Sequence, residues 1–310
     1  GNLKTLKTDV DSDKVYERAH EFRQKFYVGN NMYLCIQSSE SLDKLQEIVV
    51  DKFSSITSGS RYLRNVESTS PFKEDFFEKV LYVKPKSDKL KLYVTFVMPS
   101  MEKHYKTKPH DYLAYIIQHE GVGSLSAFLK KNLLALHVEA GATDQSFEGN
   151  SMFTLFSITI LLTEKGYENI EEVLTAVFSI LKMLKETSIL QHQKAFEELK
   201  QIRDTSFEFR EEKQSGEYTE ELSVNMMFYE AEDIIGGADK FYDFDGEMTS
   251  RLIDIMNGGK FNLLFLSNKH AQYRFTEKWF GTNYDEIGKY LKNNKTLNFV
   301  TYFLNSYCQR

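Results

Sequence analysis

The residue types most able to do chemistry stand together in one short stretch, "YIIQHEGVGSLSAFLKKN", residues 115–132. Its histidine beside a glutamate, His119-Glu120, is the pairing found on a zinc-peptidase helix. Such a helix needs two histidines on one face, four residues apart, with a glutamate beside one of them. No other histidine lies four residues from His119, and the sequence contains neither HxxEH nor HExxH. The pattern therefore favours the end of a helix, with Gly121 at the C′ position.

The glycines after this histidine raise a second possibility, a phosphate held at a helix N-terminus. However, "GVGS" follows a helix rather than a strand, and it lacks the full GxGxxG or GxxxxGK[ST] pattern. A tight turn with Ser124 as the N-cap of the next helix is favoured instead. The sequence has no Gly-x-Ser-x-Gly elbow, and Cys35 lies in an apolar, strand-like run that is typical of a core residue. The chain thus shows no complete active site.

The composition indicates a folded chain without the features of a nucleic-acid or membrane protein. Its 310 residues are 41% hydrophobic and 14% aromatic, which is enough to build real cores. The net charge is −6 without a basic run, and no apolar run reaches membrane-spanning length. Cys35 and Cys308 lie far apart, which fits a reducing compartment, and we expect a cytoplasmic protein. The polar start, without a signal peptide or initiator methionine, suggests a chain excised from a longer one.

Hydrophobic periodicity predicts helices and strands that alternate irregularly. A Ser/Thr-rich segment at 57–71 is interpreted as a linker that contains a domain boundary. We infer an α+β fold, with helices packed on mainly antiparallel sheets. Helices are predicted over 9–27, 40–56, 109–121, 124–132, 167–187, 189–213 and 218–229, and strands over 30–39, 78–85, 89–99, 133–145, 151–163 and 260–268.

Four segments carry a resemblance to one protein family: "GNLKTL", "HYKTKPHDYLAYIIQHEGVGSLSAFLKK", "FEGNSMFTLFSITILLTEKGYENIEEV" and "EKWFGTNY". In this order they resemble the insulysin and nardilysin family of zinc metallopeptidases, inverzincins with the HxxEH signature, and its nardilysin branch in particular. The resemblance implies part of a clamshell of four similar α+β domains. Residues 1–66 would be the C-terminal portion of the first, zinc-peptidase domain, and residues 67–310 the second, non-catalytic domain.

The same resemblance implies that zinc belongs to another part of the parent protein. The family's ligands, the HxxEH histidines and a later glutamate, precede the matching segments, and none is present here. We therefore expect no cofactor in this chain and no peptidase activity from it alone. Its partners would be peptide substrates and the upstream and C-terminal halves of the parent. Residues 1–66, separated from their sheet, would expose Phe22, Phe26 and Phe53, and we expect them to fray or to self-associate through this face.

In the insulin-degrading branch, the second domain holds an exosite for the substrate's N-terminus, formed by a helix end and an edge strand with two glycines. The matching residues are Tyr115, Gln118 and Glu120 on the helix end, and Val138, Ala140 and Ala142 on the strand. A peptide would add a strand to this edge, and Glu120 would pair with its α-ammonium. The first of the two glycines is Ala140 here, so its methyl would crowd the peptide. A plain edge strand without binding function stays an alternative.

Two functions from different classes remain open on the sequence. In the first, the chain is the chamber-wall and substrate-anchoring part of a zinc metalloendopeptidase. In the second, it is a catalytically inert peptide-binding or scaffold protein, a paralogue or fragment that lacks the zinc domain. An HxxEH motif in the coding sequence upstream of Gly1 would distinguish the first from the second.

Overall fold

The chain divides into two compact units, which we describe separately. The computed structural model describes residues 13–59, 71–73, 76–143 and 146–287. The smaller unit takes residues 1–65 and 205–240, and the larger unit takes the rest. The boundary expected between residues 66 and 67 lies outside the described residues. Within the described ranges, every helix is too short or too polar to span a membrane.

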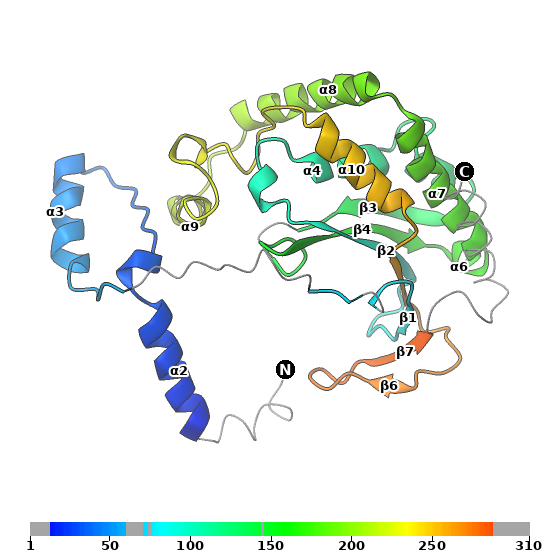
Figure 1. The fold of residues 1–310 in the computed structure, drawn as a ribbon, viewed down its shortest axis with the longest axis horizontal. Coiled ribbons are helices and arrows are strands. Elements are labelled where there is room, and N and C mark those ends of the chain that lie inside the picture. The colour runs from blue at the N-terminus through cyan, green and yellow to red at the C-terminus, as the bar shows by residue number, and fades with distance from the viewer. Residues whose placement is uncertain (1–12, 60–70, 74–75, 144–145, 288–310) are drawn as a thin grey trace. The chain divides into compact units, whose positions relative to one another are not determined.

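The described strands of the larger unit form one seven-stranded sheet with the order β3-β4-β2-β5-β1-β7-β6. Figure 1 shows this sheet below the helices α4, α8 and α10. Only β1 and β5 pair in parallel among the described strands, and all other neighbours are antiparallel. The predicted α+β fold with a mainly antiparallel sheet is therefore confirmed. The strands are β1 (Val80–Val83), β2 (Lys91–Pro99), β3 (Ala135–Gly141), β4 (Phe153–Leu162), β5 (Asn262–Leu266), β6 (Phe275–Thr276) and β7 (Asn283–Ile287).

Strict alternation of burial explains why the central strands form where the sequence predicts them. Along β2, each second residue is buried, and the residues between are half-buried. β4 repeats this pattern and pairs with β2 along its whole length, with Phe96 opposite Phe156. Since successive side chains of a strand point to opposite faces, the sheet has one apolar face and one more polar face. Thr95 and Ser157 lie on the more polar face, with their hydroxyl oxygens 2.9 Å apart.

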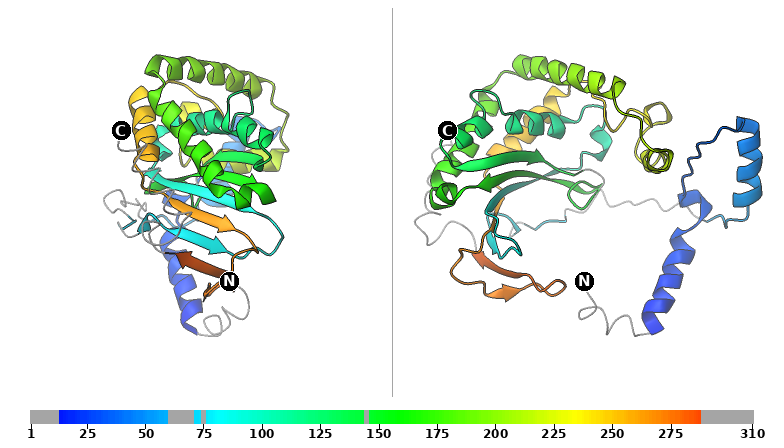
Figure 2. Two further views of the ribbon diagram at one scale, coloured as in Figure 1. Left: turned by 90° about the vertical axis from the view of Figure 1, so that its right-hand side faces the viewer. Right: turned by 180° about the vertical axis from the view of Figure 1, so that it is seen from behind.

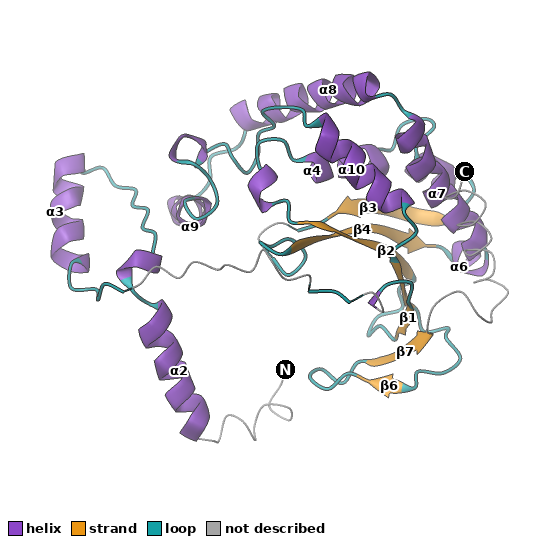
Figure 3. Ribbon diagram, viewed as in Figure 1, coloured by secondary structure: helices purple, strands orange, loops and turns teal. Residues whose placement is uncertain are grey.

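Helices cover the apolar face of the sheet, as the turned views (Figure 2) and the view coloured by secondary structure (Figure 3) show. α4 and α5 pack on β3, α10 packs on β2, and α7 packs on α5 and α10. Along α7, Val173, Val177, Leu181 and Leu184 recur at helical spacing and are buried. The helices of this unit are α4 (Pro109–Gln118), α5 (Leu125–Lys131), α6 (Glu164–Glu168), α7 (Ile170–Glu186), α10 (Gly246–Asn257), the 3-10 helix η3 (Glu102–His104) and all but the end of α8 (Ile189–Glu208).

The described part of the smaller unit is helical, and many of its large apolar side chains are exposed to solvent. Its elements are α2 (Asp13–Phe26), η1 (Gly29–Asn31), α3 (Leu42–Phe53), α9 (Ser215–Asn225) and η4 (Ala231–Asp233). Phe22 and Phe53 are exposed, as expected, with 56% and 42% of their surface accessible, and Phe26 is half-buried. The strand predicted over 30–39 is wrong, because this segment pairs with none of the described strands and is not itself a strand. Its apolar residues, including Leu34 and Ile36, remain exposed.

The sequence analysis did not predict the two strands at the far end of the sheet, β7 and β6, nor the helix that packs on β2, α10. β7 has the polar sequence "NYDEI", and tertiary pairing with β1 defines it. Its Asp285 is 4% exposed and accepts hydrogen bonds from His270 Nε2 at 3.0 Å and Arg274 Nε at 2.6 Å. Burial alone would raise the pKa of Asp285, but these two hydrogen bonds and the charge of Arg274 outweigh burial and lower it.

Candidate functional site

The described sheet ends at β3, which therefore has one free edge. β3 pairs with β4 through residues 135–141, with a bulge between Ala135 and His137. An edge strand presents backbone N–H and C=O groups that another chain can pair with. The edge strand that the sequence analysis placed over these residues is therefore present.

The backbone groups of Ala140 face this free edge. The Ala140 N–H donates to Gln118 Oε1 on α4, with an N···O distance of 3.5 Å, so it points away from β4. In an antiparallel ladder, backbone groups of successive residues point alternately towards the neighbour and away from it. The N–H and C=O of Val138 therefore point the same way as those of Ala140. A bound strand would find its hydrogen-bond partners on these alternate residues.

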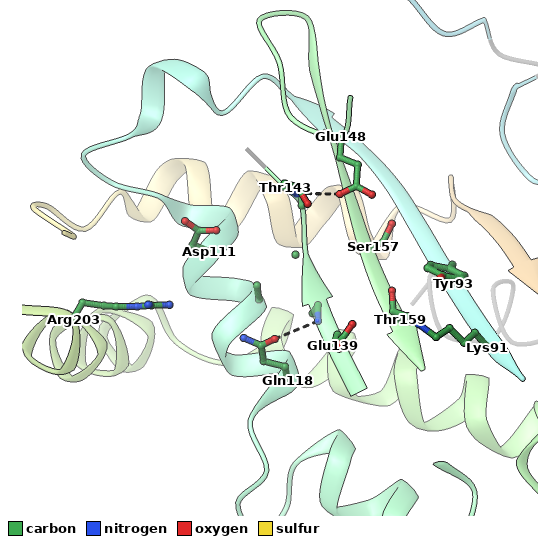
Figure 4. A pocket seen from close by; sticks show the side chains of 14 residues that line it. Lys91, Tyr93, Asp111, Gln118, Glu139, Thr143, Glu148, Ser157, Thr159 and Arg203 are labelled. Carbon is green, nitrogen blue, oxygen red and sulfur yellow. Dashed lines mark hydrogen bonds between the residues drawn. The ribbon is translucent and has the colours of Figure 1, made fainter. Parts of the chain in front are cut away.

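A hollow of about 400 Å³ lies around this edge (Figure 4). One wall comes from α4 and α8, the other from the more polar face of the sheet. Three of the six predicted binding residues, Gln118, Ala140 and Ala142, line the hollow. The complete lining consists of Lys91, Tyr93, Asp111, Ala114, Gln118, Glu139, Ala140, Gly141, Ala142, Thr143, Glu148, Ser157, Thr159 and Arg203.

The other three predicted residues are not in the lining of the hollow. The Val138 side chain is buried in the core, so only its backbone can serve the edge. Tyr115 is half-buried beside the ring of His119. Glu120 is exposed and accepts a hydrogen bond from Lys130 Nζ at 2.5 Å. That hydrogen bond and the charge of Lys130 lower the pKa of Glu120, so this carboxylate is ionised and already paired.

The methyl group of Ala140 does not obstruct the edge in the way that the sequence suggested. It is half-buried and packs against the core below the sheet. Strand side chains stand perpendicular to the sheet, whereas an added strand lies in its plane. The next residue, Gly141, has φ +135°, a backbone conformation that side chains disfavour, so glycine is required there rather than at position 140.

α4 ends earlier than predicted, and His119 lies in the turn after the helix, where its side chain accepts a backbone hydrogen bond. The helix ends at Gln118, because His119 turns to extended backbone with ψ 141°, and Gly121 is therefore not its C′ residue. His119 is exposed, and its Nδ1 accepts the Gly121 N–H at 2.9 Å. The predicted tight turn is present: Gly123 has φ +87°, and Ser124 Oγ accepts the Ala127 N–H at 3.1 Å. "HEGVGS" therefore links two helices.

Several lining residues were not anticipated from the sequence. Asp111, Ala114 and Gln118 share one face of α4 at spacings of three and four residues, a signal that was available once this helix was predicted. Arg203 on α8 and Lys91 on β2 carry no such signal. Each of these two cations lines the hollow without an ion pair to any described residue. The walls therefore offer charge of both signs beside the free backbone edge.

Comparison with known proteins identifies similar domains. Residues 14–203 match the peptidase M16 inactive domain, and residues 207–292 match the middle or third domain of peptidase M16. The chain is 34% identical to human nardilysin over 288 residues, which is 92% of this chain and 25% of that protein. It is 27% identical to bovine insulin-degrading enzyme over 289 residues, covering 92% of this chain and 28% of the relative. The chain thus spans about a quarter of the length of these curated relatives.

The fold is also similar to that of a solved peptidase. The crystal structure of pitrilysin superimposes with a TM-score of 0.84 at 22% identity, covering 99% of this chain and 32% of pitrilysin. At this identity the comparison shows the fold alone. The family resemblance drawn from the sequence is confirmed.

Proposed function

Because the chain belongs to the peptidase M16 family, we propose that it anchors peptide substrates for an insulysin- or nardilysin-like zinc endopeptidase and does not cleave them itself. The observation that carries this proposal is the free edge of β3, bordered by a hollow with polar and charged walls. Both functions left open by the sequence share this peptide-holding role. The match to the inactive domain of the family supports the assignment of chemistry to another part of the parent.

The residues of this chain do not fit the zinc ion that the family implies. A peptidase zinc site requires histidine and carboxylate ligands that converge from fixed positions. The described residues contain no group of three or more histidine, cysteine, aspartate or glutamate side chains that could hold a metal ion. The 310 residues of this chain contain no HxxEH motif. We therefore assign this chain no step of peptide hydrolysis.

In the proposed complex, a substrate adds a strand to the edge of β3. Each main-chain hydrogen bond would contribute about 0.5–1.5 kcal/mol net. A few such bonds must offset roughly 4–15 kcal/mol lost on association. Binding by this chain alone should therefore be weak, with Kd in the micromolar range or above, and closure of the parent protein around the substrate would strengthen it.

Strand addition predicts an alternating dependence on the peptide backbone. A short fluorescent peptide is methylated at one backbone nitrogen at a time, and its Kd is measured by fluorescence polarisation. Methylation at every second residue should weaken binding about tenfold, because it removes one hydrogen bond to the edge. The intervening residues, whose N–H groups face solvent, are the internal control. Equal effects at consecutive residues, or no effect at any residue, would contradict strand addition.

We also propose that Glu120 contacts the α-ammonium group of the substrate, as the family resemblance implies. Glu120 already forms an ion pair with Lys130. The α-ammonium group must share Glu120 with Lys130 or replace it, which the sequence did not indicate. Glu120 lies 4.0 Å from His137 Nδ1, near the beginning of β3. A peptide whose N-terminus reaches Glu120 would therefore run parallel to β3.

A double-mutant cycle tests this contact. N-terminal acetylation of the peptide should weaken binding by about two- to fivefold, the value of a partly exposed ion pair. Glu120→Gln should weaken binding of the free peptide equally, and the two changes together should cost little more than either alone. Glu172→Gln, an exposed carboxylate on α7, is the matched control. If the effects of acetylation and of Glu120→Gln simply add, Glu120 does not contact the peptide N-terminus. Strand addition to β3 would be unaffected by that result.

The exposed apolar residues of the smaller unit support a further part of the proposal. Tyr16, Phe22, Leu42 and Phe53 are exposed on α2 and α3. Fully burying a large apolar side chain contributes roughly 1.5–3 kcal/mol. We propose that upstream parts of the parent protein cover these residues, and that a second copy covers them when this chain is isolated.

A further inference from the structure

We infer that the side chain of Gln118 is an internal competitor for the edge of β3, and that a bound peptide must displace it. The inference rests on the proposed function, because it concerns the same edge. Gln118 Oε1 accepts the Ala140 N–H, which is a donor that an added strand would use. The carbonyl of the Gln118 amide thus occupies the position of a peptide carbonyl.

The position of Gln118 allows such an exchange. It is the last residue of α4, and its side chain borders the hollow, where it is half-buried (Figure 4). Displacement of the amide would therefore move it into the hollow, without disturbing the core. The N···O distance of 3.5 Å is at the long end of hydrogen bonds, so the contact is weak enough to be broken by a better acceptor.

The backbone on either side of Gln118 supports the contact. Ala114, one turn earlier on α4, lies near β3, since a Cβ added to Gly141 would be 3.5 Å from the Ala114 Cβ. After Gln118, the Gly121 N–H donates to His119 Nδ1 and stabilises the turn that leaves the helix. The α carbon of Gln118 is therefore held beside the strand, while its side chain retains rotatable bonds. This is the arrangement expected of a replaceable side-chain contact.

The competition would set a threshold for ligands at this edge. A peptide gains one hydrogen bond to Ala140 but loses the one that Gln118 already makes, so the net gain at this position is small. Removal of the Gln118 amide should therefore strengthen binding. Replacement by a stronger acceptor should weaken it, because a carboxylate accepts an N–H more strongly than an amide does.

Three substitutions at this residue test the inference, with an N-acetylated peptide used throughout so that the charge at the peptide's N-terminus plays no part. Gln118→Ala and Gln118→Met should each bind the peptide about two- to tenfold more tightly than the wild type, the range for one net hydrogen bond. Gln118→Glu should bind it more weakly. Met keeps the length of the side chain without its acceptor. Tightening in Ala but not in Met would mean that bulk alone obstructs the edge, and would overturn the inference.

Hydrogen exchange without peptide supplies a second readout. The Ala140 amide should exchange several-fold faster in Gln118→Met, whereas the Glu139 and Gly141 amides, which face β4, should keep their protection and show that the sheet is intact. If wild-type binding lacks the alternating effect of N-methylation, the proposed function fails. If that alternation is present and all Gln118 variants bind like the wild type, this inference alone is overturned.

Discussion

Gly166→Ala should lower the free energy of unfolding of the larger unit by about 3 kcal/mol, at the upper end for overpacking. Gly166 lies in α6, and a Cβ placed there would be 1.9 Å from the Leu134 carbonyl oxygen and 2.8 Å from its carbon. Real contacts of this kind essentially never fall below 3.0 Å. The obstructing atoms are backbone, so no side-chain rotation can relieve the overlap.

The contacts around Gly166 explain why the backbone cannot easily shift. Thr163 Oγ1 accepts the Gly166 N–H at 2.9 Å and donates to the Leu133 carbonyl at 2.6 Å, and the Thr163 N–H donates to the Leu134 carbonyl at 3.1 Å. α6 is thereby tied to the residues just before β3. The substitution should therefore also reduce peptide binding through displacement of the edge strand.

Gly216→Ala is the matched control for this prediction. Gly216 lies in α9, and a Cβ there would meet no atom within 4 Å. Alanine has the higher helix propensity, so this change should be neutral or slightly stabilising. Urea unfolding of both variants, followed by circular dichroism, measures the difference. Equal stabilities for the two variants would show that the backbone around Gly166 relaxes freely.

Tyr112→Phe should lower the free energy of unfolding by about 1–3 kcal/mol, although it removes a single oxygen atom. Tyr112 is 1% exposed and His192 is 4% exposed. His192 Nε2 lies 2.9 Å from the Leu184 carbonyl, which can only accept, so Nε2 carries the proton. In the neutral imidazole Nδ1 is then an acceptor, and the Tyr112 hydroxyl donates to it at 2.8 Å. Phenylalanine leaves this buried nitrogen without its donor. Burial also raises the pKa of Tyr112, so its hydroxyl remains a donor throughout the ordinary pH range.

Tyr115→Phe, in the same helix, is the control for the loss of a hydroxyl, since Tyr115 is half-buried and its hydroxyl makes no hydrogen bond with the described residues. Tyr115→Phe should change the free energy of unfolding by no more than about 0.5 kcal/mol. A second measurement combines Tyr112→Phe with His192→Leu. Because both changes delete one interaction, the double variant should be more stable than the sum of the single effects implies. If the double variant loses as much stability as the two single variants added together, the two side chains are not coupled.

The location of the candidate site was predictable from the sequence only through the family resemblance. That resemblance identified Gln118, Ala140 and Ala142, which line the hollow, and it also included Val138, whose side chain lies in the core. Residue type alone could not separate these roles, because an edge strand binds through its backbone. Arg203 joins the hollow from α8, and its sequence neighbourhood gave no indication of this position.

The sequence by itself determined the elements that have a strong local period and clear ends. Alternation defined β2 and β4, helical spacing defined α7, and the hydroxyl of Ser124 capped α5, as predicted. These features depend on residues a few positions apart. That these 310 residues contain no HxxEH motif is likewise read from the sequence without the structure.

Only the tertiary structure decided which strand has a free edge and what lies beside it. Residues 30–39 have a strand-like sequence but no described partner, whereas the polar β7 is a strand because β1 pairs with it. β1 lies parallel to β5, with Val80 opposite Leu263. The contact between Gln118 and Ala140 is a further example. Each depends on residues far apart in the chain, so no local pattern encodes it: strand pairing and edge exposure are properties of the assembled sheet.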